Sequence, residues 1–182
     1  MLPSNQHALR TAYDQYGPRT DRDDIAAGYA AAIGAVLSAA LYVLSVWLVN
    51  SGHLGLDWSP YFAALEFHWV VYSSTVGSVI AAPTAFLIGV AGWRAIQTQT
   101  AFSGVLRGVV GAAATYVAAF VPIAAIFFVT GVGSAAAGSA LANALELAGI
   151  VVAVGFALTW WLTIPIGCLV GVAYTVSSST TA

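Results

Sequence analysis

The stretch PTAFLIGVAGW, residues 83–93, has a counterpart in PIGCLVGVAY, residues 165–174. Each begins with proline and, after three residues, reads Leu, a β-branched residue, Gly, Val and Ala before an aromatic residue. Upstream, AALEF (63–67) matches NALEL (143–147), so that a glutamate, Glu66 or Glu146, precedes each apolar run. The same order written twice predicts a tandem duplication.

The repeated unit is predicted to be a hairpin of two helices. Each copy of the phrase ends a long apolar run, and a less similar run precedes it, with Gly28 and Gly108 at matching positions. A hairpin returns the chain to its starting side, so its duplicate has the same orientation. The repeat therefore predicts a pseudo-two-fold axis along the membrane normal.

The composition indicates a polytopic membrane protein of the all-α class. Of 182 residues, 60% are hydrophobic and 7% charged, whereas soluble domains contain about 25% charged residues. A membrane-spanning helix needs about 20 apolar residues, and four runs are long enough. We expect helices over residues 25–49, 65–93, 104–130 and 145–176.

The arginines predict the orientation. All the basic residues are arginines, and they lie before the first run or around the second connection, at positions 10, 19, 22, 94 and 107. By the positive-inside rule, both termini are cytoplasmic, with an N-terminal tail over 1–24, a transmembrane domain over 25–176 and a C-terminal tail over 177–182. The connection over 131–144 is predicted to be either a flexible loop or a short interfacial helix from residue 135 to 145.

Prolines and glycines lie within the apolar runs, where they predict helix kinks and helix contacts. Kinks are predicted at Pro83, Pro122 and Pro165, because a proline inside a helix removes one backbone hydrogen bond. The carbonyls of Val79 and Trp161 then need other partners, for which Thr84 and Thr163 are candidates. Small residues allow close helix approach in lipid, and the glycines expected to pack the helices are Gly89, Gly104, Gly108, Gly167 and Gly171.

Two interpretations of the glutamates remain open. Glu66 and Glu146 either begin helices at the outer membrane interface or form an acidic pair at the mouth of a pathway. His68 lies two residues after Glu66, a spacing that does not place both on one helix face. Together with His53 and Asp57 these residues could ligate a metal, but the spacing matches no compact motif, so no metal site is expected.

Tryptophan residues precede one kink. Trp160 and Trp161 lie one turn before Pro165, where they either fill space beside the kink or line a ligand pocket.

Several function classes are excluded on sequence grounds. A net charge of −2 leaves no basic face for nucleic acid, and Cys168 is the single cysteine. The chain has no nucleotide-binding or nucleophile motif, and the hydroxyls of residues 73–75 have no mid-helix base to activate them. We therefore expect neither an enzyme nor a cofactor. An arginine-only, Ala/Val/Gly-rich composition fits a GC-rich genome or a halophilic archaeon.

Two main functions remain, and a third, a minor enzyme or sensor, would need Glu66, His68 and His53 to converge on one site. The first is a structural or accessory membrane subunit, with the lipid bilayer and a larger membrane complex or a second copy as its partners. The alternative is a small homo-oligomeric transporter or channel for a neutral or weakly charged solute, with Glu66 and Glu146 at its outer mouth. A polar cavity between the second and fourth helices would favour transport, and a dry Gly/Ala seam with an exposed apolar flank would favour a subunit.

Overall fold

The computed structural model describes residues 22–53, 66–95, 100–131 and 137–178, and these residues form four α-helices. In chain order the helices are α2 (Asp23–Asn50), α4 (Phe67–Ala95), α5 (Ala101–Gly131) and α6 (Ala137–Ser178). The predicted all-α class is confirmed for this part of the chain, and each helix is long and apolar enough to cross a membrane. Asp57, the first 21 residues and the end of the C-terminal tail lie outside the described residues.

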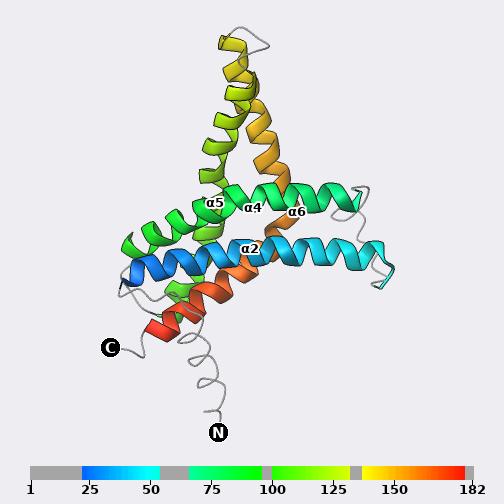
Figure 1. Ribbon diagram of the computed structural model, residues 1–182. Coiled ribbons are helices and arrows are strands. Elements are labelled where there is room, and N and C mark those ends of the chain that lie inside the picture. The colour runs from blue at the N-terminus through cyan, green and yellow to red at the C-terminus, as the bar shows by residue number, and fades with distance from the viewer. Residues whose placement is uncertain (1–21, 54–65, 96–99, 132–136, 179–182) are drawn as a thin grey trace.

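The start of α6 differs from the prediction. The helix begins at Ala137 rather than near residue 145, and the segment expected to be a loop or a separate interfacial helix continues into the membrane-length helix. Alanine is the best helix former, and Ala140, Ala144 and Ala148 are buried at a spacing that puts them on one helix face. In this first half α6 lies beside α5 (Figure 1). The alanine face packs there, and this packing extends the helix.

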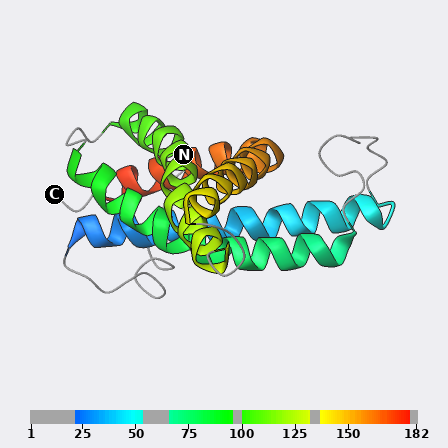
Figure 2. The same cartoon turned by 90° about the horizontal axis from the view of Figure 1, so that it is seen from above.

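The helices pack as two hairpins. α2 packs along α4, and α5 packs along α6, while α2 contacts α6 and α4 contacts α5 less extensively. Figures 1 and 2 show that the hairpins converge where α2 and α5 begin and where α4 and α6 end. This end carries Arg22, Arg94 and Arg107 and is called the basic end below. The opposite ends of the two hairpins diverge, so the four helices do not lie side by side along their whole length.

Glycines form the closest contacts between α5 and α6. A Cβ atom added to Gly104 would lie 2.8 Å from the carbonyl oxygen of Gly171, and one added to Gly167 would lie 2.8 Å from that of Gly108. Cβ atoms added to Gly108 and Gly171 would meet the backbone of Gly167 and of Gly104 even more closely. Two backbones therefore touch across a four-glycine seam, the geometry that small residues permit between membrane helices.

The α2–α4 hairpin has a smaller counterpart of this seam. A Cβ atom on Gly89 would lie 3.0 Å from the Cα atom of Gly28 and 2.9 Å from the carbonyl oxygen of Ala27. A Cβ atom on Gly28 would instead meet the side chains of Val90 and Phe86, at 2.7 and 2.8 Å. Glycine thus brings α2 and α4 together, but larger side chains fill part of the contact.

The prolines lie inside helices, as expected. Pro83 is within α4, Pro122 within α5 and Pro165 within α6, and Figure 1 shows α6 changing direction in its orange segment. The proposed partners for the displaced carbonyls are wrong. Thr84 donates to Ile80 O (2.7 Å) and Thr163 donates to Thr159 O (3.1 Å), because a threonine hydroxyl reaches the carbonyl one turn before it in its own helix.

Large apolar side chains cover the outside of the hairpins. Val79, Val117, Val129 and Leu169 are each at least 70% exposed. The largest fully buried side chains among the described residues are Val46 and Val70, which pack with Tyr42. A fold with so much apolar surface outside and so little inside is suited to a lipid solvent.

Candidate functional site

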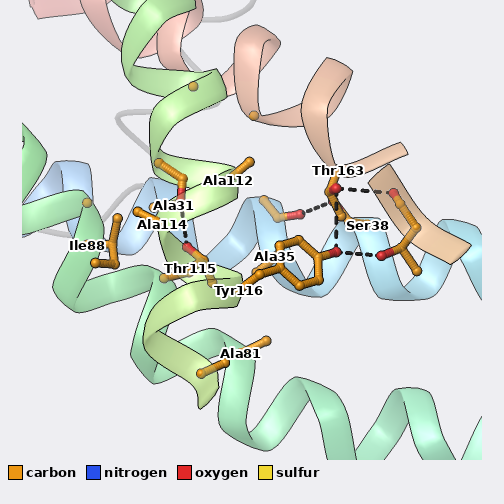
Figure 3. Close-up of a pocket in the computed structure, with 18 of the residues that line it drawn as sticks. Ala31, Ala35, Ser38, Ala81, Ile88, Ala112, Ala114, Thr115, Tyr116 and Thr163 are labelled. Atoms are coloured by element: carbon orange, nitrogen blue, oxygen red, sulfur yellow. Dashed lines mark hydrogen bonds between the residues drawn. The ribbon is translucent and has the colours of Figure 1, made fainter. Parts of the chain in front are cut away.

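The main feature of the interior is a pocket of about 840 Å³ between the two hairpins. All four helices contribute to its wall, and most of the wall is alanine, glycine and aliphatic side chain, as Ala31, Ala35, Ala81 and Ala112 illustrate in Figure 3. Small residues leave space where helices converge but do not touch. A pocket of this size is in the range that holds a small organic molecule.

The α5–α6 wall carries a hydroxyl cluster. The Tyr116 hydroxyl lies 2.5 Å from Thr159 Oγ1 and 3.5 Å from Thr163 Oγ1, and Figure 3 shows Tyr116 pointing toward Thr163. Thr159 already donates its proton to Gly155 O (2.7 Å), so the Tyr116 hydroxyl is the donor in the short bond. The protons of this cluster are all engaged within the protein, and its oxygens remain as acceptors.

The α2–α4 wall differs in its hydrogen bonding. Ser38 and Ser78 donate to carbonyls of their own helices, at 2.8 and 2.7 Å. Tyr42 and Ser74 also line the pocket. Tyr42 is 6% exposed, and its hydroxyl has no hydrogen-bond partner within the described part of the chain. This wall therefore holds one buried hydroxyl, that of Tyr42, whose proton has no acceptor among the described residues.

Aromatic and charged side chains close the pocket at the basic end. Arg107 lies over the ring of Trp93 at 4.7 Å, and Trp93 makes an edge contact with Tyr174 at 5.0 Å. The Tyr174 hydroxyl donates to Asp23 O (2.7 Å). The chain of contacts joins one residue from each helix, and Arg107 is the charged side chain among the lining residues that the structure describes.

An ion cluster ties α2 to α4 beside this closure. Asp24 accepts from Arg22 at 2.9 Å and from Arg94 at 2.5 Å. The Asp24 carboxylate, through its hydrogen bond and then its charge, raises the pKa of Arg22. Because Arg94 lies in the last turn of α4 and Asp24 in the first turn of α2, the cluster links the two helices at the basic end.

The predicted acidic residues do not meet in the structure. Glu66 precedes α4, is exposed, and lies 3.4 Å from His68 Nδ1. Glu146 is exposed about two and a half turns into α6 rather than in its first turn. The hairpin ends that carry these residues diverge (Figure 1). None of the three lines the pocket.

Glu66 and His68 approach each other without sharing a helix face. Glu66 is not helical; its carbonyl accepts from Trp69 N (2.9 Å) as the helix begins. The helical rule that residues two apart do not face each other therefore does not apply to this pair. His53 stacks on Trp47 at 5.7 Å instead of joining them, and the described residues contain no group of three potential metal ligands.

Trp160 and Trp161 are not among the residues that line the pocket. Trp161 donates its indole N–H to Leu158 O (2.8 Å) and packs against the Tyr42, Val46 and Val70 cluster, and Trp160 is 43% exposed. Of the two interpretations offered by the sequence, space filling beside the kink describes Trp161. The residues that sequence reasoning missed are Tyr42 and Tyr116. The signal that could have found them is that every predicted span carries hydroxyl side chains near its middle.

Comparison of the chain with protein family models, curated proteins and solved structures found no match.

Proposed function

We propose that this chain is a small membrane carrier or channel in which a neutral solute occupies the pocket between the hairpins. The observation that carries the proposal is the position of the pocket. Glycine contacts hold α5 against α6 and α2 against α4, while the pocket of about 840 Å³ lies between these two units. Tight packing within each hairpin and open space between them is the arrangement that lets one half rock against the other.

The wall chemistry supports a neutral solute. Carboxylates are absent from the described lining, and Arg107, its charged residue, is in contact with Trp93 at the basic end. An ion in an apolar pocket would need a partner of opposite charge. Hydroxyl oxygens can instead orient an uncharged molecule. The proposal includes no catalytic step and no cofactor.

The membrane arrangement is part of the proposal. Four spans with both termini cytoplasmic would place the basic end, with Arg22, Arg94 and Arg107, on the inner side. Four helices are few for a complete pathway, so we expect a homodimer. Because Glu66 and Glu146 lie on diverging hairpins, the proposal no longer places them at a shared mouth.

A tandem duplication underlies the two-unit arrangement. Gly28 meets Gly89 within the first hairpin, and the residues at matching sequence positions, Gly108 and Gly171, lie in the seam of the second. If α2 corresponds to α5 and α4 to α6, a two-fold rotation exchanges the two contacts between hairpins, α2 with α6 and α5 with α4. These correspondences support descent of both hairpins from one.

Cysteine labelling tests the proposal with matched neighbours. In a Cys168→Ala background, Ser78→Cys places a thiol on the pocket wall, and Val79→Cys places one on the lipid-facing side, 72% exposed. Thr159→Cys and Trp160→Cys form the same pair on α6. A membrane-impermeant maleimide should label the pocket positions at least several-fold faster than their neighbours. Equal, negligible labelling at all four positions would contradict a solute pathway.

A structural or accessory subunit is the second candidate. The divergence of the hairpin ends (Figure 2) favours it, together with the exposed large apolar side chains on α2, α4, α5 and α6. Such side chains can pack against helices of a larger complex. Negligible labelling of the pocket cysteines would favour this function.

A further inference from the structure

The two walls of the pocket offer complementary hydrogen-bonding groups. On the α5–α6 side, the protons of Tyr116, Thr159 and Thr163 are engaged within the protein. A ligand group near this wall can donate to the oxygens but cannot accept from them. On the α2–α4 side, Tyr42 has a hydroxyl proton with no acceptor among the described residues, and Ser74 adds a second hydroxyl to this wall.

A single ligand hydroxyl in contact with both walls would satisfy both. It can donate its proton to an oxygen of the α5–α6 cluster and accept a proton from the α2–α4 wall. An ether can only accept, an ammonium can only donate, and a carboxylate would enter an apolar wall with its charge. The rest of the lining, mainly alanine, glycine and aliphatic carbon, suits a hydrocarbon body.

We propose that the pocket binds a largely apolar alcohol whose hydroxyl bridges the two hairpins. The proposal rests on the proposed function, since it names the solute class of the same pocket, and it assigns Ser74, Tyr42 and Tyr116 as ligand-binding residues. Ser74 is partly exposed to the pocket and meets the ligand directly. The Tyr42 hydroxyl is covered by protein atoms in this structure, and it reaches the ligand when its ring turns or the hairpins part.

Position along the helices supports a shared site for these residues. Tyr42 belongs to a cluster against which Leu158 and Leu162 pack. These leucines are the neighbours in sequence of Thr159 and Thr163, which bond to Tyr116. The cluster that contains Tyr42 therefore packs against the same turns of α6 that carry the acceptor cluster.

Photolabelling of the full-length protein in lipid nanodiscs tests the proposal. The probes are a long-chain alkyl alcohol carrying a diazirine, its methyl ether and the matched carboxylate, with labelled residues identified by mass spectrometry. The alcohol should label pocket-lining residues roughly three- to tenfold more than the ether, the ratio expected for one hydrogen bond. The carboxylate should label them less than either.

Substitutions at the α2–α4 wall should reduce this preference. Ser74→Ala and Tyr42→Phe are each expected to lower alcohol labelling about threefold and to leave ether labelling nearly unchanged. The matched controls are Thr75→Ala, next to Ser74 in sequence, and Tyr72→Phe, the same substitution as at Tyr42. Neither residue lines the pocket, so neither substitution should change alcohol or ether labelling. A Tyr42→Phe variant that labels like the parent chain would remove Tyr42 from the site.

The outcomes separate this inference from the proposed function. Equal labelling of the pocket by alcohol and ether would overturn the selectivity for a hydroxyl, while a solute pocket would stand. Labelling confined to lipid-facing residues such as Val79 and Trp160 would overturn the alcohol site, and the cysteine accessibility experiment would then decide the proposed function independently.

Discussion

Glycines bring the helices together in both hairpins, but the two hairpins should differ in how well they tolerate a larger residue at those positions. In the α5–α6 hairpin, glycines on both helices bring backbone against backbone at Gly104, Gly108, Gly167 and Gly171. In the α2–α4 hairpin, Gly28 faces the side chains of Val90 and Phe86, and an ion cluster adds a tie at the basic end. A side chain can turn away from an added atom, but a carbonyl fixed in a helix cannot. The second hairpin should therefore be the less tolerant of substitution.

The largest effect is expected at the four-glycine seam. A Gly108→Ala substitution would drive Cβ into the backbone of Gly167, so the helices must separate. We expect a loss of about 3 kcal/mol in the free energy of unfolding, at the upper end of overpacking effects. Thermal and denaturant unfolding in detergent, followed by tryptophan fluorescence, measures it.

The control for this substitution is on the same helix. Gly111 has open space where its Cβ would be, so Gly111→Ala should leave stability unchanged or raise it by about 1 kcal/mol through helix propensity. Similar losses at both glycines would show that the loss at Gly108 does not come from the close contact with α6.

A smaller effect is expected at the corresponding position of the first hairpin. In Gly28→Ala, Val90 and Phe86 can shift to make room, and alanine gains about 1 kcal/mol of helix propensity. The net loss should be about 1 kcal/mol, well below that of Gly108→Ala, in the same unfolding assay. A loss of unfolding free energy equal to that of Gly108→Ala would show that the two hairpins do not differ in tolerance.

Phenylalanine substitutions at Tyr42 and Tyr116, which lie on different walls of the pocket, should change stability in opposite directions. Tyr116→Phe removes the bond to Thr159 and should cost about 1 kcal/mol. Tyr42 has a buried hydroxyl without a partner among the described residues, so Tyr42→Phe should be neutral or stabilise by up to about 1 kcal/mol. Unfolding of purified protein in detergent without added alcohol measures both; a clear loss for Tyr42→Phe would mean that its hydroxyl is bonded.

The smallest effect is expected at the ion cluster. Asp24→Asn weakens the contacts with Arg22 and Arg94, but exposed ion pairs contribute little and are screened by salt. The midpoint of unfolding should fall slightly at low ionic strength, and the difference should vanish at high salt. Asp23→Asn is the control, since Asp23 accepts the Tyr174 hydrogen bond through its backbone carbonyl, which the substitution retains. A large, salt-independent loss would mean that the cluster, and not glycine packing, holds α2 to α4.

Local pattern alone determined much of this protein. Long apolar runs in lipid can satisfy their backbone groups only as helices, so the composition predicted four helices. The prolines lie within these helices, as predicted. The glycines of the repeated phrase marked the helix faces that come together, because only such residues let backbones touch. The arginines marked one end of every helix pair.

The tertiary structure decided what lies between the helices. Helix rotation and crossing, which depend on contacts between distant residues, set Gly108 against Gly167 and leave a pocket where alanine faces converge. Packing of Ala140, Ala144 and Ala148 extended α6 past the predicted start and moved Glu146 away from the helix terminus. Whether Tyr42 and Tyr116 reach one pocket depends on the angle between the hairpins. That angle cannot be predicted from the residue pattern of a single helix.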